Sequence, residues 1–125
     1  VITPHPGEMA RLCGTSTAEV QRDRIGIARR FAMERGVVVV LKGARTVCAL
    51  PGGEVYVNPT GNPAMATAGT GDVLAGVIGA LLAQGLTAAQ AATLGVYRHG
   101  AAGDRAAAKR NNPRHIAAGD LLEEL

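Results

Sequence analysis

Aromatic side chains are scarce in this chain of 125 residues, in which Phe and Tyr together make up 2% and Trp is absent. Hydrophobic residues nevertheless account for 47% of the chain, so any core must be built from Ala, Val, Leu and Ile with close glycine contacts. Such a core is tightly packed but weakly anchored. With 17 glycines in the chain, we expect marginal stability.

Cysteine is equally scarce, and Cys13 and Cys48 lie far apart with no Cys/His cluster near either. This pattern does not indicate a zinc site or any other protein-held metal, and it favours reduced thiols in a cytoplasmic protein. A long hydrophobic run is also missing, because the helical apolar stretch from Val73 to Ala83 is too short to cross a bilayer. We interpret this stretch as a buried core helix, with Gly76 and Gly79 on one side for close backbone approach.

The charge balance is basic, with a formal net charge of +3 and a pI near 9.3. The basic residues are scattered through 11–45 and 98–114, however, and no aromatic residues are interleaved with them. Nucleic-acid platforms combine basic grooves with stacking aromatics, so a nucleic-acid partner is not expected. A small anionic ligand or a generic basic surface accounts for the charge.

Helical and strand patterns alternate along the chain. Ser16 and Glu19 have the spacing of a capping box, and Gly14, Gly36 and Gly85 are typical helix ends. The continuous β-branched run at 37–41 predicts a strand buried on both faces of a parallel sheet. The expected elements are a strand end at 1–3, helices at 8–13 and 16–36, strands at 37–41, 46–50 and 54–58 with a hairpin turn at 51–53, and helices at 70–84, 87–109 and 119–125 with a break at 111–113. This order fits an α/β fold with three layers.

A glycine-rich loop lies directly before the apolar helix that we expect to begin at about Thr70. The first N–H groups of a helix have no partner within it, and the helix dipole adds partial positive charge at the same end. Gly69, Thr70 and Gly71 are therefore predicted to form an anion hole for a phosphate group.

Asp72 follows this loop and falls in the first helical turn. A carboxylate there could act as a base towards a hydroxyl beside a transferring phosphoryl group, where the protein supplies mainly positioning and electrostatics. The alternative is structural, because the helix dipole alone favours an acid in the first turn. Both interpretations remain open on these residues.

Three segments of the chain resemble the C-terminal dehydratase domain of bacterial NAD(P)H-hydrate repair proteins, which belongs to the ribokinase-like superfamily. They are Thr3-Pro-His-Pro-Gly-Glu-Met9, Leu41-Lys-Gly-Ala-Arg-Thr46 and Gly61-Asn-Pro-Ala-Met-Ala-Thr-Ala-Gly-Thr-Gly-Asp-Val-Leu-Ala-Gly76. Their order and spacing agree with the family over nearly the whole chain. Family domains are about twice this long, so the resemblance implies that residues 1–125 form the C-terminal portion of one such domain, without its N-terminal half.

The resemblance implies ADP-dependent dehydration of the S epimer of hydrated NADH or NADPH (NADHX and NADPHX). Phosphorylation of the hydrate hydroxyl and elimination of phosphate would restore the dihydronicotinamide and release AMP. ADP would be the co-substrate with Mg²⁺, and the protein would be a homo-oligomer, fused to or paired with an NAD(P)H-hydrate epimerase domain. Two alternatives stay open: a ribokinase-like kinase for a vitamin or sugar, and a nucleotide-binding fragment without catalysis.

The family's functional residues are carried over position by position. Asp72 would be the catalytic base and contact the substrate, and His5 would bind the dinucleotide hydrate with Glu8 nearby. The adenine nucleotide would be bound by Lys42, Gly43, Ala44, Arg45, Thr46 and Gly71. Of the remaining polar residues, Asn58, Asn62 and Thr67 are candidates to orient the nucleotide or a metal, Met65 is interpreted as packing, and His99 and His115 match nothing catalytic.

Overall fold

The computed structural model describes residues 1–110 and 115–125. These residues form two compact units, Val1–Val57 (unit 1) and Asn58–Leu125 (unit 2), and each is described by itself. The helix break expected at 111–113 lies outside the described residues. Within the described part of the chain, no helix has both the length and the apolarity needed to cross a membrane.

Three helices open unit 1: α1 (Pro6–Cys13), α2 (Thr17–Arg22) and α3 (Arg24–Arg35). The expected capping box is present at α2, where the Ser16 hydroxyl accepts from the Glu19 N–H and the Glu19 carboxylate accepts from the Ser16 N–H. Gly14 and Gly36 adopt left-handed conformations after α1 and α3, with φ of 64° and 63°. These helix ends confirm the prediction from the glycines.

The single helix predicted for residues 16–36 is wrong, because Asp23 divides it into α2 and α3. Asp23 leaves the helical conformation (φ −137°, ψ 64°), and its carboxylate accepts from the N–H of Gly26 at 2.9 Å. An Asp side chain competes with the backbone for N–H groups, and this competition favours the start of a new helix at Arg24.

The strands β1 (Val39–Leu41), β2 (Val47–Ala49) and β3 (Val55–Val57) form a sheet in the order β1-β2-β3. Both pairs are antiparallel, and Ile2 adds a parallel bridge to Val39. The parallel pairing expected around residues 37–41 is present in the bridge to Ile2 and is wrong for the pair of β1 and β2, whereas β2 and β3 form the expected hairpin. Only residues 42–46 connect β1 to β2, and a parallel crossover needs about a dozen residues or more.

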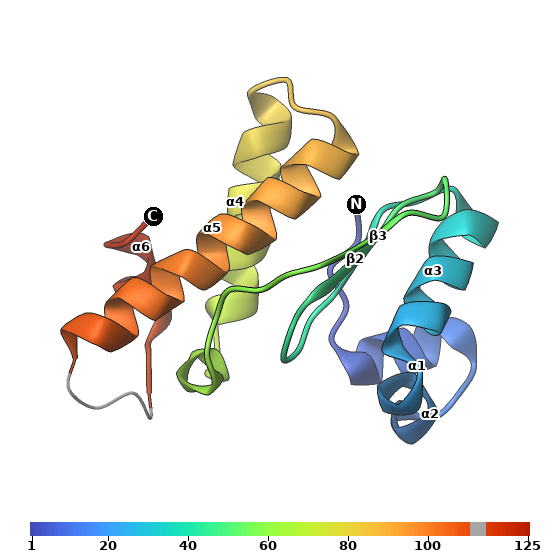
Figure 1. The fold of residues 1–125 in the computed structure, drawn as a ribbon, viewed down its shortest axis with the longest axis horizontal. Helices are drawn as coiled ribbons and strands as arrows, with labels where there is room; N and C mark the ends of the chain where they lie inside the picture. The colour runs from blue at the N-terminus through green and yellow to red at the C-terminus, as the bar shows by residue number, and fades with distance from the viewer. Residues whose placement is uncertain (111–114) are drawn as a thin grey trace. The chain divides into compact units, whose positions relative to one another are not determined.

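The core of unit 1 lies between the sheet and its helices, and Figure 1 shows α3 running alongside the strands. The register places Val39 opposite Ala49 and Leu41 opposite Val47, so these four side chains share one face. They are buried with Ile27, Ala28 and Ala32 of α3 and with Met9 and Ala10 of α1. Every residue of β1 and β2 is buried, which the apolar run at 37–41 predicted for β1.

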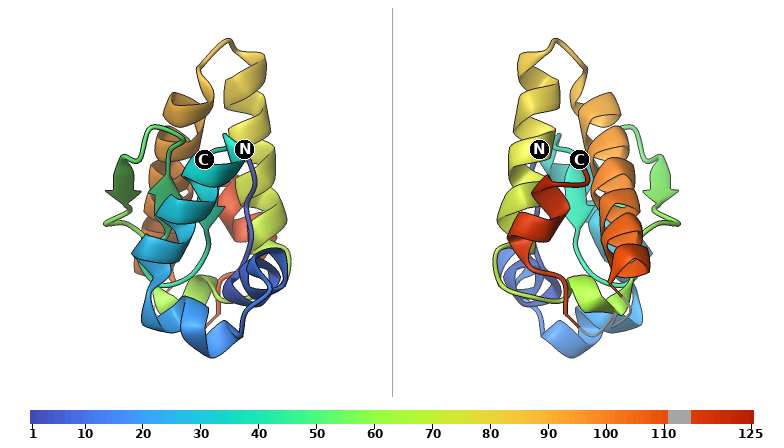
Figure 2. Two further views of the ribbon diagram at one scale, coloured as in Figure 1. Left: turned by 90° about the vertical axis from the view of Figure 1, so that its right-hand side faces the viewer. Right: turned by 90° about the vertical axis from the view of Figure 1, so that its left-hand side faces the viewer.

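Unit 2 contains the short 3₁₀ helix η1 (Pro63–Met65) and the helices α4 (Thr70–Ala83), α5 (Ala88–Lys109) and α6 (Ala118–Leu122). The predicted start at Thr70 and the predicted cap at Thr87 are confirmed. Both views of Figure 2 show α4 and α5 side by side as a helical hairpin. Beside it, Met65 packs on a cluster formed by Ala64, Ala102, Ala106, Ile116 and Leu121, which confirms its packing role.

The glycines that permit close approach lie on α5 rather than on α4. A Cβ at Gly76 or Gly79 would meet nothing within 4 Å, so the expected backbone approach there is wrong for unit 2. We expected α4 to be a buried core helix. Only one stripe of it is buried, formed by Thr70, Leu74, Ile78 and Leu81. On α5, a Cβ at Gly95 would lie 2.7 Å from Ile78 and one at Gly100 would lie 2.2 Å from the Thr60 hydroxyl.

The two sets of glycines predict opposite effects of alanine. Gly100→Ala should lower the free energy of unfolding by roughly 1 to 3 kcal/mol, because its methyl group would also lie 2.8 Å from the Thr60 backbone. Gly76→Ala should raise it by about 0.5 to 1 kcal/mol, since an exposed helical Gly→Ala change meets open space. Urea denaturation of both variants measures the difference, and equal midpoints would contradict this account of the packing.

Candidate functional site

The first turn of α4 presents free backbone donors. Gly69 is the N-cap residue in a left-handed conformation (φ 86°), and no side chain caps the helix. The N–H groups of Asp72 and Val73 both donate to the Gly69 carbonyl at 3.1 Å. Among the described residues, none accepts a hydrogen bond from the N–H groups of Thr70 and Gly71. These two donors, at the positive end of a helix of 14 residues, can bind an anion.

The polypeptide that carries these donors is held by hydrogen bonds on its other side. The Thr70 hydroxyl lies 2.9 Å from the carbonyl oxygens of Met65 and Thr67, and the Thr67 hydroxyl donates to the Ile116 carbonyl at 2.6 Å. The Thr70 side chain is therefore structural, and its N–H group is the donor that has no acceptor among the described residues. A loop fixed in this way needs little reorganisation when a charged ligand binds.

His99 of α5, which matched no catalytic pattern in the sequence, also contacts this turn. Its Nε2 lies 2.9 Å from the Thr70 carbonyl oxygen, so Nε2 carries the proton and donates. Burial lowers the pKa of His99 below its ordinary value of 6.5 and keeps the imidazole neutral, while the hydrogen bond to Thr70 opposes this shift. The contact joins residues 29 positions apart, and no spacing pattern in the sequence indicates it.

In unit 1, His5, Glu8 and Lys42 lie together. The His5 Nδ1 atom accepts from the N–H groups of Gly7 and Glu8 at 3.0 and 3.2 Å, so His5 is the N-cap of α1. Glu8 accepts from the His5 N–H at 2.6 Å, and this hydrogen bond lowers the pKa of Glu8. The Lys42 Nζ atom lies 3.7 Å from the same carboxylate, and the backbone N–H of Lys42 donates to the Pro4 carbonyl. The fold therefore brings together the first two segments that the sequence singled out.

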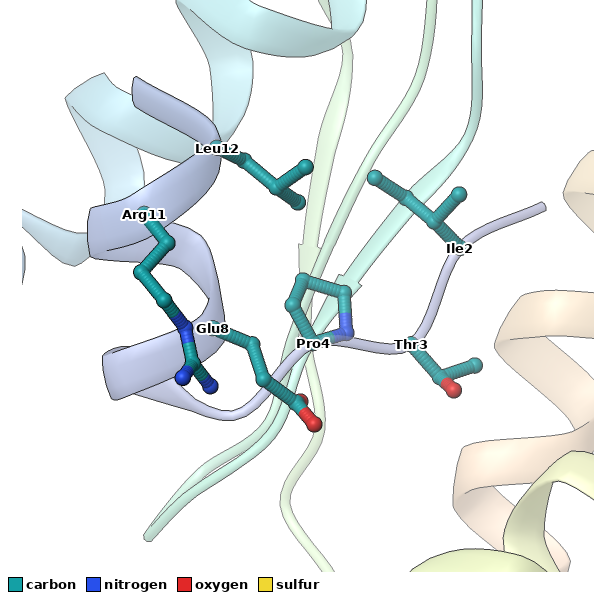
Figure 3. A pocket seen from close by; sticks show the side chains of 6 residues that line it. All are labelled: Ile2, Thr3, Pro4, Glu8, Arg11 and Leu12. Atoms are coloured by element: carbon teal, nitrogen blue, oxygen red, sulfur yellow. The ribbon is translucent and has the colours of Figure 1, made fainter. Parts of the chain in front are cut away.

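A hollow of about 490 Å³ lies beside this cluster and has Glu8 in its wall. Figure 3 shows Ile2 and Leu12 pointing towards one another above Pro4, with the carboxylate of Glu8 below Pro4. The hollow thus has an apolar end and a charged end. It could accept a ligand with both kinds of surface.

The loop from Lys42 to Thr46 is held by Arg24, which the sequence analysis did not include. The Arg24 guanidinium donates to the carbonyls of Leu41 and Lys42 at 3.2 Å and also to that of Ala44. Gly43 has a φ of 138°, and a Cβ there would lie 2.9 Å from the Arg24 guanidinium. Both observations explain why glycine occupies this position.

The other polar candidates have structural partners. The buried Asn58 side chain donates to the carbonyls of Thr60 and Val96, both at 3.1 Å. The Asn62 side chain donates to Asp104 at 2.9 Å and accepts from the Ala64 N–H at 3.1 Å. With the Thr67 bond described above, these contacts account for three residues first considered for nucleotide or metal binding. The roles expected for Asp72, His5, Lys42–Thr46 and Gly71 stay predictions.

The family model described as NAD(P)H-hydrate dehydratase matches residues 1–125. This chain belongs to that family. The bifunctional NAD(P)H-hydrate repair enzyme of Moorella thermoacetica is 61% identical over 125 residues, which are all of this chain and 23% of that protein. The ADP-dependent (S)-NAD(P)H-hydrate dehydratase of Neisseria meningitidis is 53% identical over 104 residues, 83% of this chain and 35% of that protein.

Solved structures agree with this membership. The ADP/ATP-dependent NAD(P)H-hydrate dehydratase of Bacillus subtilis, co-crystallised with ATP/Mg²⁺, has a TM-score of 0.91 and 38% identity, and the match covers 98% of this chain and 45% of that one. A ribokinase-like superfamily protein from Enterococcus faecalis has a TM-score of 0.80 and 33% identity over 97% of this chain and 40% of that one. The expected ribokinase-like α/β fold class is confirmed. The chain spans less than half the length of each of these four proteins.

The buried His99 predicts a pH dependence of stability. Its pKa is lower in the folded protein than in the unfolded chain, so the unfolded chain gains the proton first as the pH falls. The stability contributed by neutral His99 is complete above pH 6.5 and is lost as the pH falls from there through the lowered pKa of the folded state. Urea midpoints at about pH 7.5 and about pH 5.5 should therefore differ less in His99→Gln than in the wild type. An identical decrease in both proteins would show that His99 does not titrate in this way.

Proposed function

We propose that this chain is part of an enzyme that uses ADP to dehydrate the S epimer of NADHX or NADPHX to NADH or NADPH. The reaction transfers a phosphoryl group from ADP to the hydrate hydroxyl and then eliminates phosphate, so its products are the reduced dinucleotide, AMP and phosphate. Family membership supports the reaction class, a lyase of nicotinamide nucleotide repair. The Neisseria and Bacillus relatives are an ADP-dependent and an ADP/ATP-dependent NAD(P)H-hydrate dehydratase, which supports ADP as the co-substrate and this substrate class.

The start of α4 is the observation that carries the proposal. The N–H groups of Thr70 and Gly71 have no acceptor among the described residues, and the exposed carboxylate of Asp72 follows immediately. Phosphoryl transfer requires donors for the phosphate oxygens and a group that takes the proton of the attacking hydroxyl. One helix turn supplies both.

The residues take the following roles in this proposal. Gly69, Thr70 and Gly71 surround the transferring phosphoryl group, and Asp72 removes the proton from the hydrate hydroxyl. In unit 1, the loop from Lys42 to Thr46 contributes to nucleotide binding. The exposed His5 keeps Nδ1 in the α1 cap and its Nε2 atom lies 3.5 Å from the Glu8 carboxylate, so the dinucleotide hydrate would bind at the Nε2 edge of the ring, beside Glu8.

Magnesium fits the chemistry of this site as a companion of the nucleotide. Mg²⁺ is usually held by one or two carboxylates together with the substrate phosphates. The described residues contain no group of three or more His, Cys, Asp or Glu side chains that could hold a metal ion alone. Phosphates at the Gly69–Gly71 turn would therefore be its main ligands, and the ion would neutralise charge on the transferring group.

The extent and the partners of the chain belong to the same proposal. We place all of residues 1–125 in one dehydratase domain, the C-terminal portion of a ribokinase-like domain, and the family match over this whole range supports that placement. The Moorella relative is named a bifunctional repair enzyme, which supports fusion to a second activity such as the epimerase. Homo-oligomer formation and a cytoplasmic location stay predictions.

Asp72→Asn tests the proposed base. Asparagine keeps the shape of the side chain but cannot accept the proton, so turnover of hydrated NADH by the intact protein should fall about 100- to 10,000-fold. The affinity for ADP should stay the same or improve, because a negative charge leaves the neighbourhood of the phosphates. Steady-state kinetics and calorimetric titration of ADP measure the two effects.

A first-turn carboxylate without a catalytic role serves as the control. Glu19 of α2 accepts hydrogen bonds from Thr15 and Ser16, which lower its pKa to about 2. Glu19→Gln should therefore lower the melting temperature and leave turnover unchanged. If Asp72 were only a first-turn acid, Asp72→Asn would behave in the same way, with a loss of roughly 0.3 to 1 kcal/mol in stability and near-normal turnover. That result would refute the catalytic role.

A further inference from the structure

In the Lys42–Thr46 loop, the backbone carbonyls of residues 42–44 have hydrogen-bond partners within the protein, whereas several backbone N–H groups have none among the described residues. The Arg24 guanidinium donates hydrogen bonds to the carbonyls of Leu41, Lys42 and Ala44. Among residues 41–44, only the Gly43 carbonyl does not accept from Arg24. The Gly43 carbonyl lies 3.3 Å from the Thr46 hydroxyl, which donates to it. The carbonyl oxygens from 41 to 44 are therefore all directed to donors of the protein itself.

The N–H group of Lys42 donates to the Pro4 carbonyl, but the next three N–H groups of the loop differ. No acceptor among residues 1–110 and 115–125 receives a hydrogen bond from the N–H groups of Gly43, Ala44 and Arg45. Arg45 has a positive φ of 54° and Gly43 one of 138°, so the chain turns sharply here. Successive N–H groups in such a turn form a concave, donor-rich surface that suits an anion.

The charge of Arg24 is not balanced within the described part of the chain. No carboxylate there lies within salt-bridge distance of its guanidinium, and its Nε atom is buried without a hydrogen-bond partner. Burial disfavours the charged form and lowers its pKa. An uncompensated cation behind a donor-rich loop strengthens the attraction of the loop for an anion.

Gly43 fits this arrangement sterically. A side chain at this position would collide with the guanidinium, since a Cβ would lie 2.9 Å from one of its nitrogens and 3.2 Å from its central carbon. The loop backbone and Arg24 are thus matched in shape as well as in hydrogen bonding. Arg22, two positions earlier in the chain and exposed, takes part in none of these contacts.

We propose that Arg24 is a positioning residue for nucleotide binding, which holds the carbonyls of the Lys42–Thr46 loop so that the N–H groups of Gly43, Ala44 and Arg45 face the phosphates of the adenine nucleotide. The inference rests on the proposed function, because it assumes that this loop binds ADP. It assigns no step of the chemistry to Arg24. Arg24 therefore affects how tightly ADP binds and leaves the rate of the bound complex almost unchanged.

Three variants of the intact protein test this role. Arg24→Met replaces the aliphatic part of the side chain but removes its donors and charge, Arg24→Lys keeps the charge but cannot reach three carbonyls at once, and Arg22→Met is the matched control. Calorimetry gives the Kd for ADP and for adenosine, steady-state kinetics give kcat and the KM for ADP, and thermal melting confirms that each variant is folded.

Arg24→Met should raise the Kd and KM for ADP about tenfold or more, with kcat within about threefold of the wild type. The Kd for adenosine, which has no phosphates, should stay unchanged, whereas general damage to the fold would weaken both ligands. Arg24→Lys should be intermediate and Arg22→Met should equal the wild type. If Arg24→Met does not fold, the comparison is made with Arg24→Lys.

The titrations distinguish a wrong role for Arg24 from a wrong function for the protein. A folded Arg24 variant that binds ADP as tightly as the wild type, or that loses ADP and adenosine affinity equally, would overturn the role of Arg24 alone. A wild-type protein that does not bind ADP would overturn the proposed function itself. The two failures are therefore distinguishable in one set of titrations.

Discussion

The first turn of α4 leaves two backbone N–H groups without an acceptor in the described part of the chain, and many contacts of unit 2 hold them in place. The left-handed Gly69 ends the preceding loop without a capping side chain, and the Thr70 hydroxyl fixes that loop from behind. Every helix start has unpaired donors. At this one the preceding loop is held by hydrogen bonds of the Thr70 and Thr67 hydroxyls, and no described residue accepts from the N–H groups of Thr70 and Gly71.

A common device serves the glycine loops of both units. In unit 2, His99 donates to the Thr70 carbonyl, and in unit 1, Arg24 donates to three carbonyls around Gly43. Each side chain comes from a helix distant in sequence and satisfies backbone acceptors of the loop, while neighbouring N–H groups have no acceptor among the described residues. Preorganised N–H groups of this kind stabilise negative charge without reorganisation when it develops. The same logic explains why the loops are glycine-rich, because the donors must be approached closely.

The sequence predicted what depends on neighbouring residues. The Ser16 and Thr87 caps, the glycine helix ends, the hairpin at 51–53 and the start of α4 were all readable from local patterns. The resemblance of three segments to one family predicted the fold class and the family, and both are confirmed. The segments themselves gave the candidate residues, whose roles stay proposals.

The errors arose where distant contacts or competing local interactions decide the outcome. Asp23 divides a helix because its side chain caps Gly26, and the short link between β1 and β2 imposes antiparallel pairing on a run that looked parallel. The closely packed glycines of α5 could not be distinguished from the exposed glycines of α4, since only the position of Thr60 distinguishes Gly100 from Gly76. His99 and Arg24 were missed for the same reason, because each acts on a carbonyl far away in the sequence.

The most direct test of the central claim is a crystal structure of the intact protein with ADP and Mg²⁺. The account predicts that phosphate oxygens lie about 2.7 to 3.2 Å from the backbone nitrogen of Gly71 in the first turn of α4, with the loop in the conformation described here. Nucleotide phosphates bound elsewhere, with only water against the N–H groups of Thr70 and Gly71, would contradict it.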